Sequence, residues 1–476
     1  MKKLLCILLT LVMVLSMAAC SKSAEPATGS TSTDGNTPAA SDTEKTETPT
    51  KTDEVVELRF MDVIPSPARE ATFQQLVAEF NAQNPDIKVV YESVPWDEAH
   101  NKLITQGSAG SMPDIFVMHQ QWNAEFTSAG WVLPLDDYIA NWEGYDNLIP
   151  YAQNVLMDYD QKNIYGYTFG IPDGLSTHAM FVRSDWLEEA GLTVDDLSTW
   201  DGIFAAAEKM TDTSKNRYGF AFRGARMGSE QMGMYILAQL GGKLYEDDGT
   251  CRINTPEGLE AFKRYCSLYV DGYSPADSIN WGYAEMVQGF TSGLSGILNQ
   301  TSEVVATCNE SMEDGTWTVI PFPKAADGYL YSKADSWFYA IGSSTEHPEE
   351  AWRFIEFMLK PESNLTYCET NLYIPVTKGA ENDPRFTEGG MSGFVKSMND
   401  EMFIREPFYG YFPELAEFME SVYDVEMQKY LLGQQTAEQS VENISNYLTE
   451  AQQRFMAENP DSPMPCAVRV DGTEVH

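Results

Sequence analysis

Residues 55–61 read VVELRFM, a run that predicts a β-strand at the start of the folded chain. An apolar stripe with i, i+3, i+4 and i+7 spacing follows and predicts a helix: Phe73, Leu76, Val77 and Phe80. A second strand is predicted over residues 87–91 and a second helix over residues 96–105. The run IFVM at residues 115–118 is typical of a parallel strand buried on both faces. This order of strands and helices predicts α/β units around a mainly parallel sheet.

The same pattern recurs further along the chain. Strands are predicted near residues 180–182, 218–222 and 296–298. Helices are predicted to begin where a capping residue or a proline marks a start, at Thr255-Pro256, at Pro348 and at Thr436. Because 476 residues exceed one ordinary α/β core, we expect two lobes.

The N-terminus has the features of an export signal. Lys2 and Lys3 precede an apolar run over residues 4–14, and small residues lead from there to Cys20. The run is shorter than the about 20 residues that span a bilayer comfortably. Residues 20–53 contain no aromatic and no large aliphatic side chain, and they predict a flexible stalk.

The sequence SMAAC at residues 16–20 resembles the lipobox of bacterial lipoproteins. That resemblance implies a signal peptide over residues 1–19 and a diacylglycerol on the sulfur of Cys20, which becomes the first residue after cleavage. Two or more acyl chains hold a protein stably at a membrane. The chain is therefore expected to be anchored by lipid at the extracellular face of the cell membrane, in a Gram-positive cell.

Charge and cysteine content narrow the possible partners. The formal net charge is -40, and so acidic a surface repels nucleic acid and anionic headgroups, so neither is expected as a partner. Five cysteines follow Cys20, and their scattered positions favour buried thiols, with one disulfide left open as an alternative: Cys251, Cys266, Cys308, Cys368 and Cys466.

Motifs for catalysis are missing from the sequence. HExxH, GxSxG, the P-loop and GxGxxG do not occur, and the five histidines form no i, i+4 pair: His100, His119, His178, His347 and His476. We therefore expect no enzyme activity, no metal and no cofactor.

Several phrases together, in order and spacing, resemble the extracellular solute-binding proteins of ABC importers, in particular the maltose-binding-protein-like sugar-binding group. They are FNAQNPDIKV at 80–89, GSMPDIF at 110–116, GWVLPL at 130–135, FVRSDWLEEAGL at 181–192, HPEEAWRF at 347–354 and YIPV at 373–376. The resemblance covers residues 55 to about 455.

The resemblance implies an α/β fold with two lobes, the type II periplasmic-binding-protein fold, and a ligand cleft between them. Lobe 1 would comprise residues 54–175 and 338–374, lobe 2 residues 176–337 and 375–460, and residues 461–476 a C-terminal tail. The implied function is capture of a sugar or oligosaccharide by hinge closure and delivery to a membrane permease, by a monomer.

Candidate ligand residues follow strand ends and crossovers, because small ligands bind at the carboxyl ends of strands in open α/β sheets. Loops after the first and third strands supply Asp62, Ser66, His119, Gln120, Gln121 and Trp122. The crossovers supply Asp173, Ser176 and Trp337. Trp281, Gln300, Arg405 and Tyr411 complete the set, as an aromatic platform, a strand-end amide and part of an aromatic-rich segment.

Two alternatives remain at this stage. A polyamine or another small cation suits the acidic balance, and Asp62, Asp173 and Asp335 could hold it beside aromatic rings. An exported polysaccharide hydrolase could use a pair of the many carboxylates.

Overall fold

The computed structural model describes residues 55–475 except 380–382 and 408. The predicted signal peptide, the Cys20 attachment site and the stalk lie outside the described residues. No helix in the described part of the chain is both long and apolar enough to cross a membrane.

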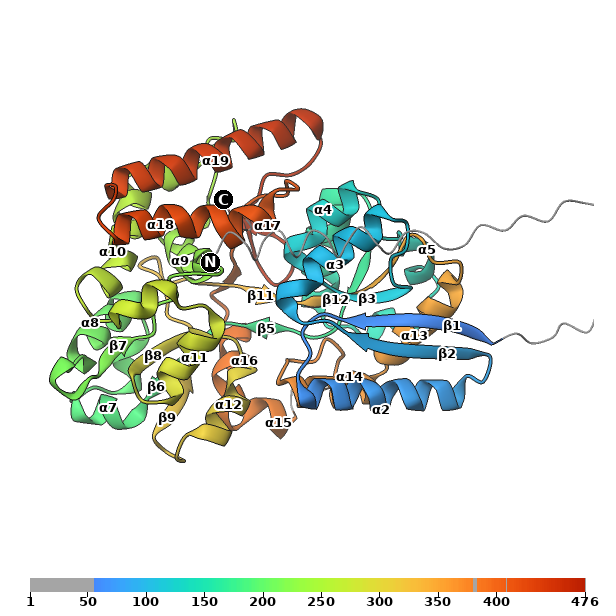
Figure 1. The fold of residues 1–476 in the computed structure, drawn as a ribbon, viewed down its shortest axis with the longest axis horizontal. Coiled ribbons are helices and arrows are strands. Elements are labelled where there is room, and N and C mark those ends of the chain that lie inside the picture. The colour runs from blue at the N-terminus through green and yellow to red at the C-terminus, as the bar shows by residue number, and fades with distance from the viewer. Residues whose placement is uncertain (1–54, 380–382, 408, 476) are drawn as a thin grey trace, which may run out of the picture. The chain divides into compact units, whose positions relative to one another are not determined.

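The first lobe is built on a five-stranded sheet with the order β2-β1-β3-β12-β4 (Figure 1). Its strands are β1 (Val56–Asp62), β2 (Ile87–Ser93), β3 (Ile115–His119), β12 (Trp337–Ile341) and β4 (Gly170–Pro172). β1 pairs in parallel with β2 and β3, as predicted, and β3 is buried at every residue. β12 runs antiparallel between β3 and β4.

Helices cover both faces of this sheet (Figure 1). α2 (Pro67–Gln83) packs against β2 and against α13 (Pro348–Met358) and α14 (Pro361–Asn371), while α3 (Trp96–Ser108) and α4 (Asn123–Ser128) lie on the other face. Smaller helices of this part of the chain are α5 (Asp136–Ile139) and α6 (Asn163–Tyr165). Residues Ala152–Lys162 form a π-helix, η3.

The second lobe is built on a four-stranded sheet with the order β7-β8-β6-β9. Its strands are β7 (Tyr218–Phe220), β8 (Ser295–Gln300), β6 (Ala179–Arg183) and β9 (Trp317–Ile320), and β6 is antiparallel to both neighbours. The larger helices are α8 (Trp200–Met210), α9 (Gly228–Gln239), α10 (Pro256–Val270), α11 (Tyr283–Thr291), α18 (Tyr423–Leu431) and α19 (Ala437–Glu458). The shorter ones are α7 (Ser184–Glu189), α12 (Val304–Ser311), α15 (Pro384–Thr387), α16 (Ser392–Met398) and α17 (Leu415–Glu417).

The predicted helix starts are confirmed. Thr255 accepts a hydrogen bond from the Gly258 N–H, and proline follows it at the first position of α10. Thr436 and Gln439 form a reciprocal capping box that begins α19.

Short strands join the two lobes. β5 (Ser176–Thr177) pairs antiparallel with β11 (Ala334–Asp335), and Leu175 pairs with Ile374 in an isolated bridge. A further sheet has the order β10-β13-β14-β15: β10 (Leu330–Ser332), β13 (Phe403–Arg405), β14 (Ala467–Val468) and β15 (Glu474–Val475). The last two strands lie in the segment that we expected to be a C-terminal tail.

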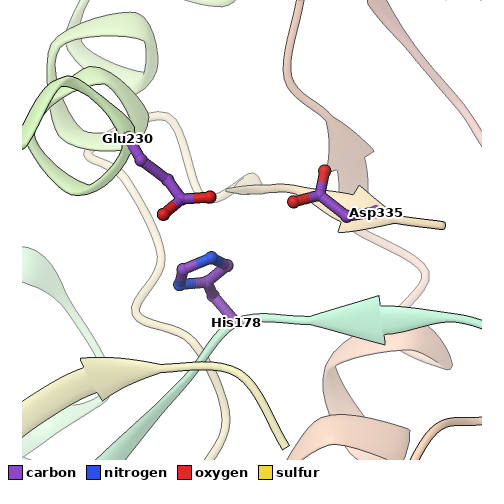
Figure 2. A group of neighbouring side chains, drawn as sticks. All are labelled: His178, Glu230 and Asp335. Carbon is purple, nitrogen blue, oxygen red and sulfur yellow. The ribbon is translucent and has the colours of Figure 1, made fainter. Parts of the chain in front are cut away.

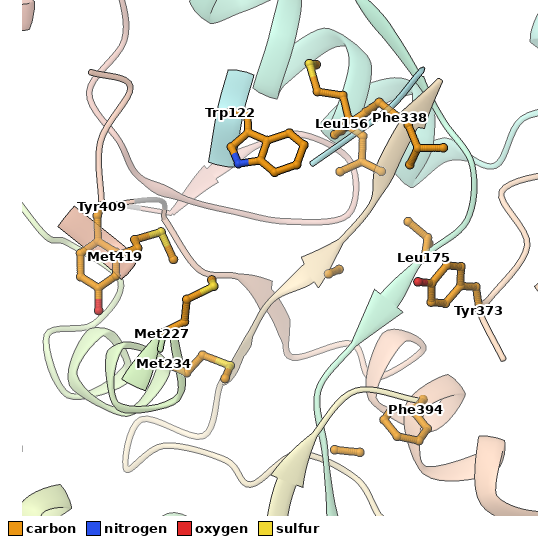
Figure 3. Packing of buried hydrophobic residues seen from close by; sticks show 14 of the residues in the cluster. Trp122, Leu156, Leu175, Met227, Met234, Phe338, Tyr373, Phe394, Tyr409 and Met419 are labelled. Carbon is orange, nitrogen blue, oxygen red and sulfur yellow. The ribbon is translucent and has the colours of Figure 1, made fainter. Parts of the chain in front are cut away.

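A continuous cluster of buried hydrophobic side chains extends through both lobes, and Figure 3 shows part of it. Trp122 and Phe338 come from the first lobe, and Met234 and Phe394 from the second. The five cysteines that follow Cys20 are free thiols, and all except Cys466 are buried.

Candidate ligand-binding site

The carboxyl ends of the parallel strands meet at one edge of the first sheet, and most of the predicted first-lobe residues gather there. Asp62 ends β1, His119 ends β3, and Asp173 directly follows β4. Trp337 begins the antiparallel β12 and pairs directly with His119. The rule that ligand residues follow strand ends therefore places these four residues on a single edge.

Trp96, His119 and Trp337 form what we call the aromatic corner. The indole rings of Trp96 and Trp337 meet edge to face, with centroids 5.4 Å apart at 87°. The imidazole of His119 lies 5.4 Å from the ring of Trp96 and 4.5 Å from that of Trp337. Both indoles are half-buried, so part of each ring faces solvent. Burial lowers the pKa of His119 to about 4, so its imidazole is neutral at pH 7.

Trp122 supports this corner from behind. It is fully buried and stacks on Trp96 at 4.9 Å and 11°, and His100 stacks on its ring at 5.2 Å. Its position is that of a core residue that fixes the orientation of Trp96, since a buried aromatic stack leaves little rotational freedom.

Asp62 and Asp173 belong to a buried ion cluster around Arg69. Asp62 accepts from Nε of Arg69 at 3.0 Å, and Asp173 accepts from the Tyr367 hydroxyl. Burial raises the pKa of Asp173 to about 7, although Arg69 nearby opposes the shift. Ser66 is exposed and caps α2 by accepting from the Arg69 N–H at 3.2 Å. These contacts give the three predicted residues structural partners within the first lobe.

A second set of polar side chains lies in the second lobe, where β8 ends and β6 begins and on helix α9, which carries Gln231. We call it the polar edge: His178, Gln231, Asn299, Gln300 and Ser302. Nδ1 of His178 lies 2.8 Å from Oδ1 of Asn299, and Gln231 donates to the Asn299 carbonyl at 2.7 Å. Because an amide oxygen only accepts, Nδ1 of His178 carries the proton and Nε2 is a free acceptor.

Each member of the polar edge has one buried polar atom without a hydrogen-bond partner among the described residues. These atoms are Nε2 of His178, Oε1 of Gln231, Nδ2 of Asn299, Nε2 of Gln300 and Oγ of Ser302. Oε1 of Gln121 and Oγ of Ser176 also lack a hydrogen-bond partner among the described residues. An unpaired buried polar group costs about 1–3 kcal/mol, so these seven atoms are candidates for pairing with another hydrogen-bonding molecule.

A charged cluster connects the two edges. Glu230 on α9 accepts from Arg223 at 2.9 Å and from Lys333 at 3.3 Å. Burial alone would raise the pKa of Glu230, but Lys333 and Arg223 hold it at about 2. Asp335 accepts from Nε2 of Gln120, which ties the first lobe to the crossover strand β11. Lys333 and Arg223 thus both lie beside the carboxylate of Glu230.

Figure 2 shows the ring of His178 directed between the carboxylates of Glu230 and Asp335. Their nearest ligand atoms lie within 4.8 Å of one another, a spacing that raises the question of a metal ion. Lys333 and Arg223 already neutralise Glu230. A divalent cation would meet two positive charges there, so the cluster is better suited to the hydroxyl groups of a neutral molecule.

Gln121 makes a direct contact between the lobes. It is buried in η1 (Gln120–Trp122) and donates to Oε1 of Glu420 at 2.8 Å. Glu420 lies in η9 (Phe418–Val422), a π-helical turn that follows α17 in the C-terminal half of the chain. This hydrogen bond exists only while the two segments are close together.

Three predicted residues have other surroundings. The ring of Trp281 packs against Gly289 of α11, and its indole nitrogen donates to Asp277 at 3.3 Å. Arg405 is buried and donates to Asp160 of η3 at 2.6 Å. Tyr411 is buried with its ring 6.4 Å from that of Phe455. These contacts lie within the core of the chain rather than at the two facing edges.

Two surface hollows lie away from both edges. One, of about 430 Å³, is lined mainly by residues 398–403 and 469–471. The other, of about 630 Å³, is lined by residues near Tyr138 and Trp352. Neither contains a predicted ligand residue.

Sequence reasoning missed several residues of the site. Trp96 lies three residues beyond β2, so the strand-end rule that selected His119 could have found it. His178 lies between the two-residue strand β5 and the strand β6, and Glu230 lies in the first turn of α9. Nothing in the local sequence marks either of these two, because tertiary folding alone brings them beside Asp335.

Comparison with known proteins identifies the class. Residues 65–365, more than half of the chain, match the family of bacterial extracellular solute-binding proteins, and the chain belongs to this family. Its members are the binding proteins of ABC importers, which confirms the resemblance drawn from the sequence and the expectation that the chain is not an enzyme.

Individual relatives agree with this assignment. An uncharacterized lipoprotein from the oleD 5′ region of Streptomyces antibioticus is 25% identical over 344 residues, which cover 69% of this chain and 72% of that protein. A maltotriose-binding protein of Pyrococcus abyssi is 26% identical over 322 residues, which cover 66% of this chain and 65% of that protein. The structure of maltose-bound T. maritima MalE3 superimposes with a TM-score of 0.69 at 21% identity, over 83% of this chain and 100% of that one. The predicted two-lobe α/β fold is thereby confirmed.

Proposed function

We propose that this protein binds a neutral sugar or oligosaccharide between its two lobes and delivers it to the permease of an ABC importer. The single observation that carries the proposal is that the polar edge, Gln121 and Ser176 have seven buried polar atoms without hydrogen-bond partners among the described residues. A sugar offers many hydroxyl groups, each able to donate and accept, and it could pair these atoms at once.

The aromatic corner supports the same ligand class. Pyranose rings have apolar C–H faces, and the half-buried indoles of Trp96 and Trp337 could pack against them. Net hydrogen bonds contribute about 0.5–1.5 kcal/mol each, and micromolar binding needs about 8 kcal/mol, so both kinds of contact are required. Relatives named for maltotriose and maltose binding agree with this ligand class.

A small cation is a poorer fit. Each carboxylate that could have held it already has a partner: Asp62 has Arg69, Asp173 has Tyr367, and Asp335 has Gln120. Moreover, Lys333 and Arg223 lie at the centre of the interface and would repel a polyamine.

The proposal includes the arrangement of the chain around this site. The lobes are divided at the crossovers near residues 176, 334–337 and 374–375, and the chain acts as a monomer. A lipid on Cys20 holds it at the extracellular face of a Gram-positive cell, with residues 20–53 as the stalk. The relative called a lipoprotein supports this anchor.

A thermal-shift panel tests the ligand class. Maltotriose, arabinotriose, erythritol and spermidine are each added to the full-length chain. A sugar at 100 times its Kd adds about 2.7 kcal/mol of stability, so we expect at least one of the neutral sugars to raise the Tm. A rise with spermidine alone would reject the proposal in favour of a cation.

A further inference from the structure

A contact between His100 and Glu125 lies outside the set of residues expected to touch a sugar. Nε2 of His100 lies 2.6 Å from Oε2 of Glu125, and the two side chains are 21% and 24% exposed. Because a carboxylate only accepts hydrogen bonds, the imidazole donates through Nε2. His100 belongs to α3, which begins with Trp96, and Glu125 belongs to α4, which directly follows Trp122. The contact therefore joins the two segments that carry the stacked indoles.

Trp96 has little local support at the start of its helix. It is the first residue of α3, and the preceding Pro95 gives the helix no side-chain cap hydrogen bond. The first N–H groups of a helix have no partner within the helix, so an uncapped first turn is easily deformed. The ring of Trp96 is also half-buried, so part of it faces solvent. Its orientation therefore depends on the rings that pack against it.

Trp122 is the ring on which Trp96 packs, and it is itself held by packing. Its indole nitrogen is buried and has no hydrogen-bond partner among the described residues. The indole lies nearly parallel to the rings of Trp96, His100 and Phe126, at angles of 11°, 8° and 22°. Trp96 and His100 are four residues apart on α3, a spacing that puts both side chains on one helix face. His100 therefore limits how far the indole of Trp122, and with it Trp96, can turn.

We propose that His100, held by Glu125, is a positioning residue: through Trp122 it fixes Trp96 and so raises the affinity for the sugar. The inference rests on the proposed function, because it counts Trp96 among the rings on which a sugar packs. The hydrogen bond to Glu125 restricts rotation of the imidazole. A ring that is already ordered loses less conformational freedom when a ligand binds, and the affinity rises accordingly.

A double-mutant cycle tests whether His100 acts through Trp96. Maltotriose and arabinotriose are titrated calorimetrically into the full-length chain and its variants. His100→Ala removes the ring and is expected to raise Kd about fivefold. In a Trp96→Leu background the same change is expected to raise Kd less than about twofold, because the effects of coupled residues are not additive.

Two further variants separate the ring of His100 from its hydrogen bond. His100→Phe keeps a flat ring that stays against the indole because it is apolar, so Kd is expected to remain within about twofold of the parent value. Glu125→Ala leaves the imidazole free to turn toward water and is expected to raise Kd about threefold. Both variants keep most of the packing, so they test the proposal if His100→Ala fails to fold.

Matched controls change the same residue types elsewhere in the first lobe. His347→Ala removes a partly buried imidazole that precedes α13, which packs with α2 on the other face of the sheet (Figure 1). Glu79→Ala removes an exposed carboxylate of α2 that accepts a hydrogen bond from Gln75. Both variants are expected to bind sugar as the parent protein does.

Fluorine NMR measures the positioning of Trp96 without any sugar. The full-length chain is labelled with fluorotryptophan, and the resonance of Trp96 is assigned by its absence from Trp96→Leu. We expect this resonance to shift and broaden in His100→Ala and in Glu125→Ala, because a released ring samples several environments. It should stay close to its parent position in His100→Phe and in both controls.

Three results would overturn the positioning role. They are an unchanged Trp96 resonance in His100→Ala, an equal loss of affinity on His100→Ala with and without Trp96, or parent affinity in both His100→Ala and Glu125→Ala. If neither sugar binds the parent protein and no neutral sugar shifts its Tm, the proposed function fails and the claim on affinity fails with it. The fluorine resonance then still decides whether His100 positions Trp96.

Discussion

At the scale of single residues, two buried glutamates near the interface have opposite protonation. Glu230 contacts Lys333 and Arg223, which hold its pKa at about 2. Glu406 is 4% exposed, and burial raises its pKa to about 8 although Lys333 opposes the shift. Glu406 is therefore neutral at pH 7, whereas Glu230 is ionised.

Glu406→Gln should make stability less sensitive to pH. In the unfolded chain Glu406 loses its proton near pH 4.5, whereas in the folded protein it keeps the proton up to about pH 8. Stability from this group is therefore complete below pH 4.5 and is lost as pH rises to 8, by an amount on the order of a few kcal/mol. Glu230, Asp335 and Lys333 face it, and Lys333 limits the loss. Urea unfolding at pH 5, 6.5 and 8 measures the effect. A constant difference between the variant and the parent protein at all three pH values would contradict it.

The strand-end rule predicted the first-lobe half of the site better than the second. His119, Gln120 and Trp337 lie at one sheet edge, as expected, because parallel strands share the edge at which they end. Trp122 was predicted as a ligand residue in the loop after the same strand, but its ring is part of the core. His178 and Glu230 could not be predicted, since their positions depend on contacts more than 50 residues apart in sequence.

At the scale of elements, the long helices and buried strands were predictable and the short strands were not. The apolar stripe within α2 and the capping box at the start of α19 are local sequence signals, and both helices form. β5, β11, β14 and β15 contain two residues each, so they have no periodicity that a sequence could show. Pairing with distant segments creates them. Through β14 and β15, residues 467–475 become part of a sheet.

Gln121→Ala should weaken sugar binding through the contact between η1 and η9. The variant loses the hydrogen bond to Glu420 in η9, and we expect that bond to form only when the two lobes are close together. A hydrogen bond to a charged group contributes about 1.5–3 kcal/mol, so affinity for the best sugar of the panel should fall about tenfold or more. Calorimetric titration measures this change. Gln75→Ala, on the exposed face of α2, is the control. Parent affinity in Gln121→Ala would show that this contact does not stabilise the closed form.

At the scale of the whole molecule, we propose a two-lobe binding protein that a lipid on Cys20 attaches to the membrane through residues 20–53. The proposed anchor would keep the protein near its permease in a cell without an outer membrane.

Cys20→Ala should release the protein into the medium with its sugar affinity unchanged. Cys20, the proposed attachment site, is far in sequence from every residue of the candidate site. Western blotting of cell and medium fractions, followed by titration of the released protein, measures both effects. Retention of the variant on cells would reject Cys20 as the attachment site, and a lower affinity would show that the lipid influences binding.

The central claim is that a neutral sugar bridges an aromatic first lobe and a polar second lobe. Isothermal titration of maltotriose and arabinotriose into the parent chain and into the Trp337→Leu/Asn299→Leu double variant tests it most directly. The account predicts saturable one-to-one binding of at least one sugar by the parent and a loss of about a hundredfold or more in the double variant. Binding of equal strength in the double variant, or no binding of either sugar by the parent, would contradict it.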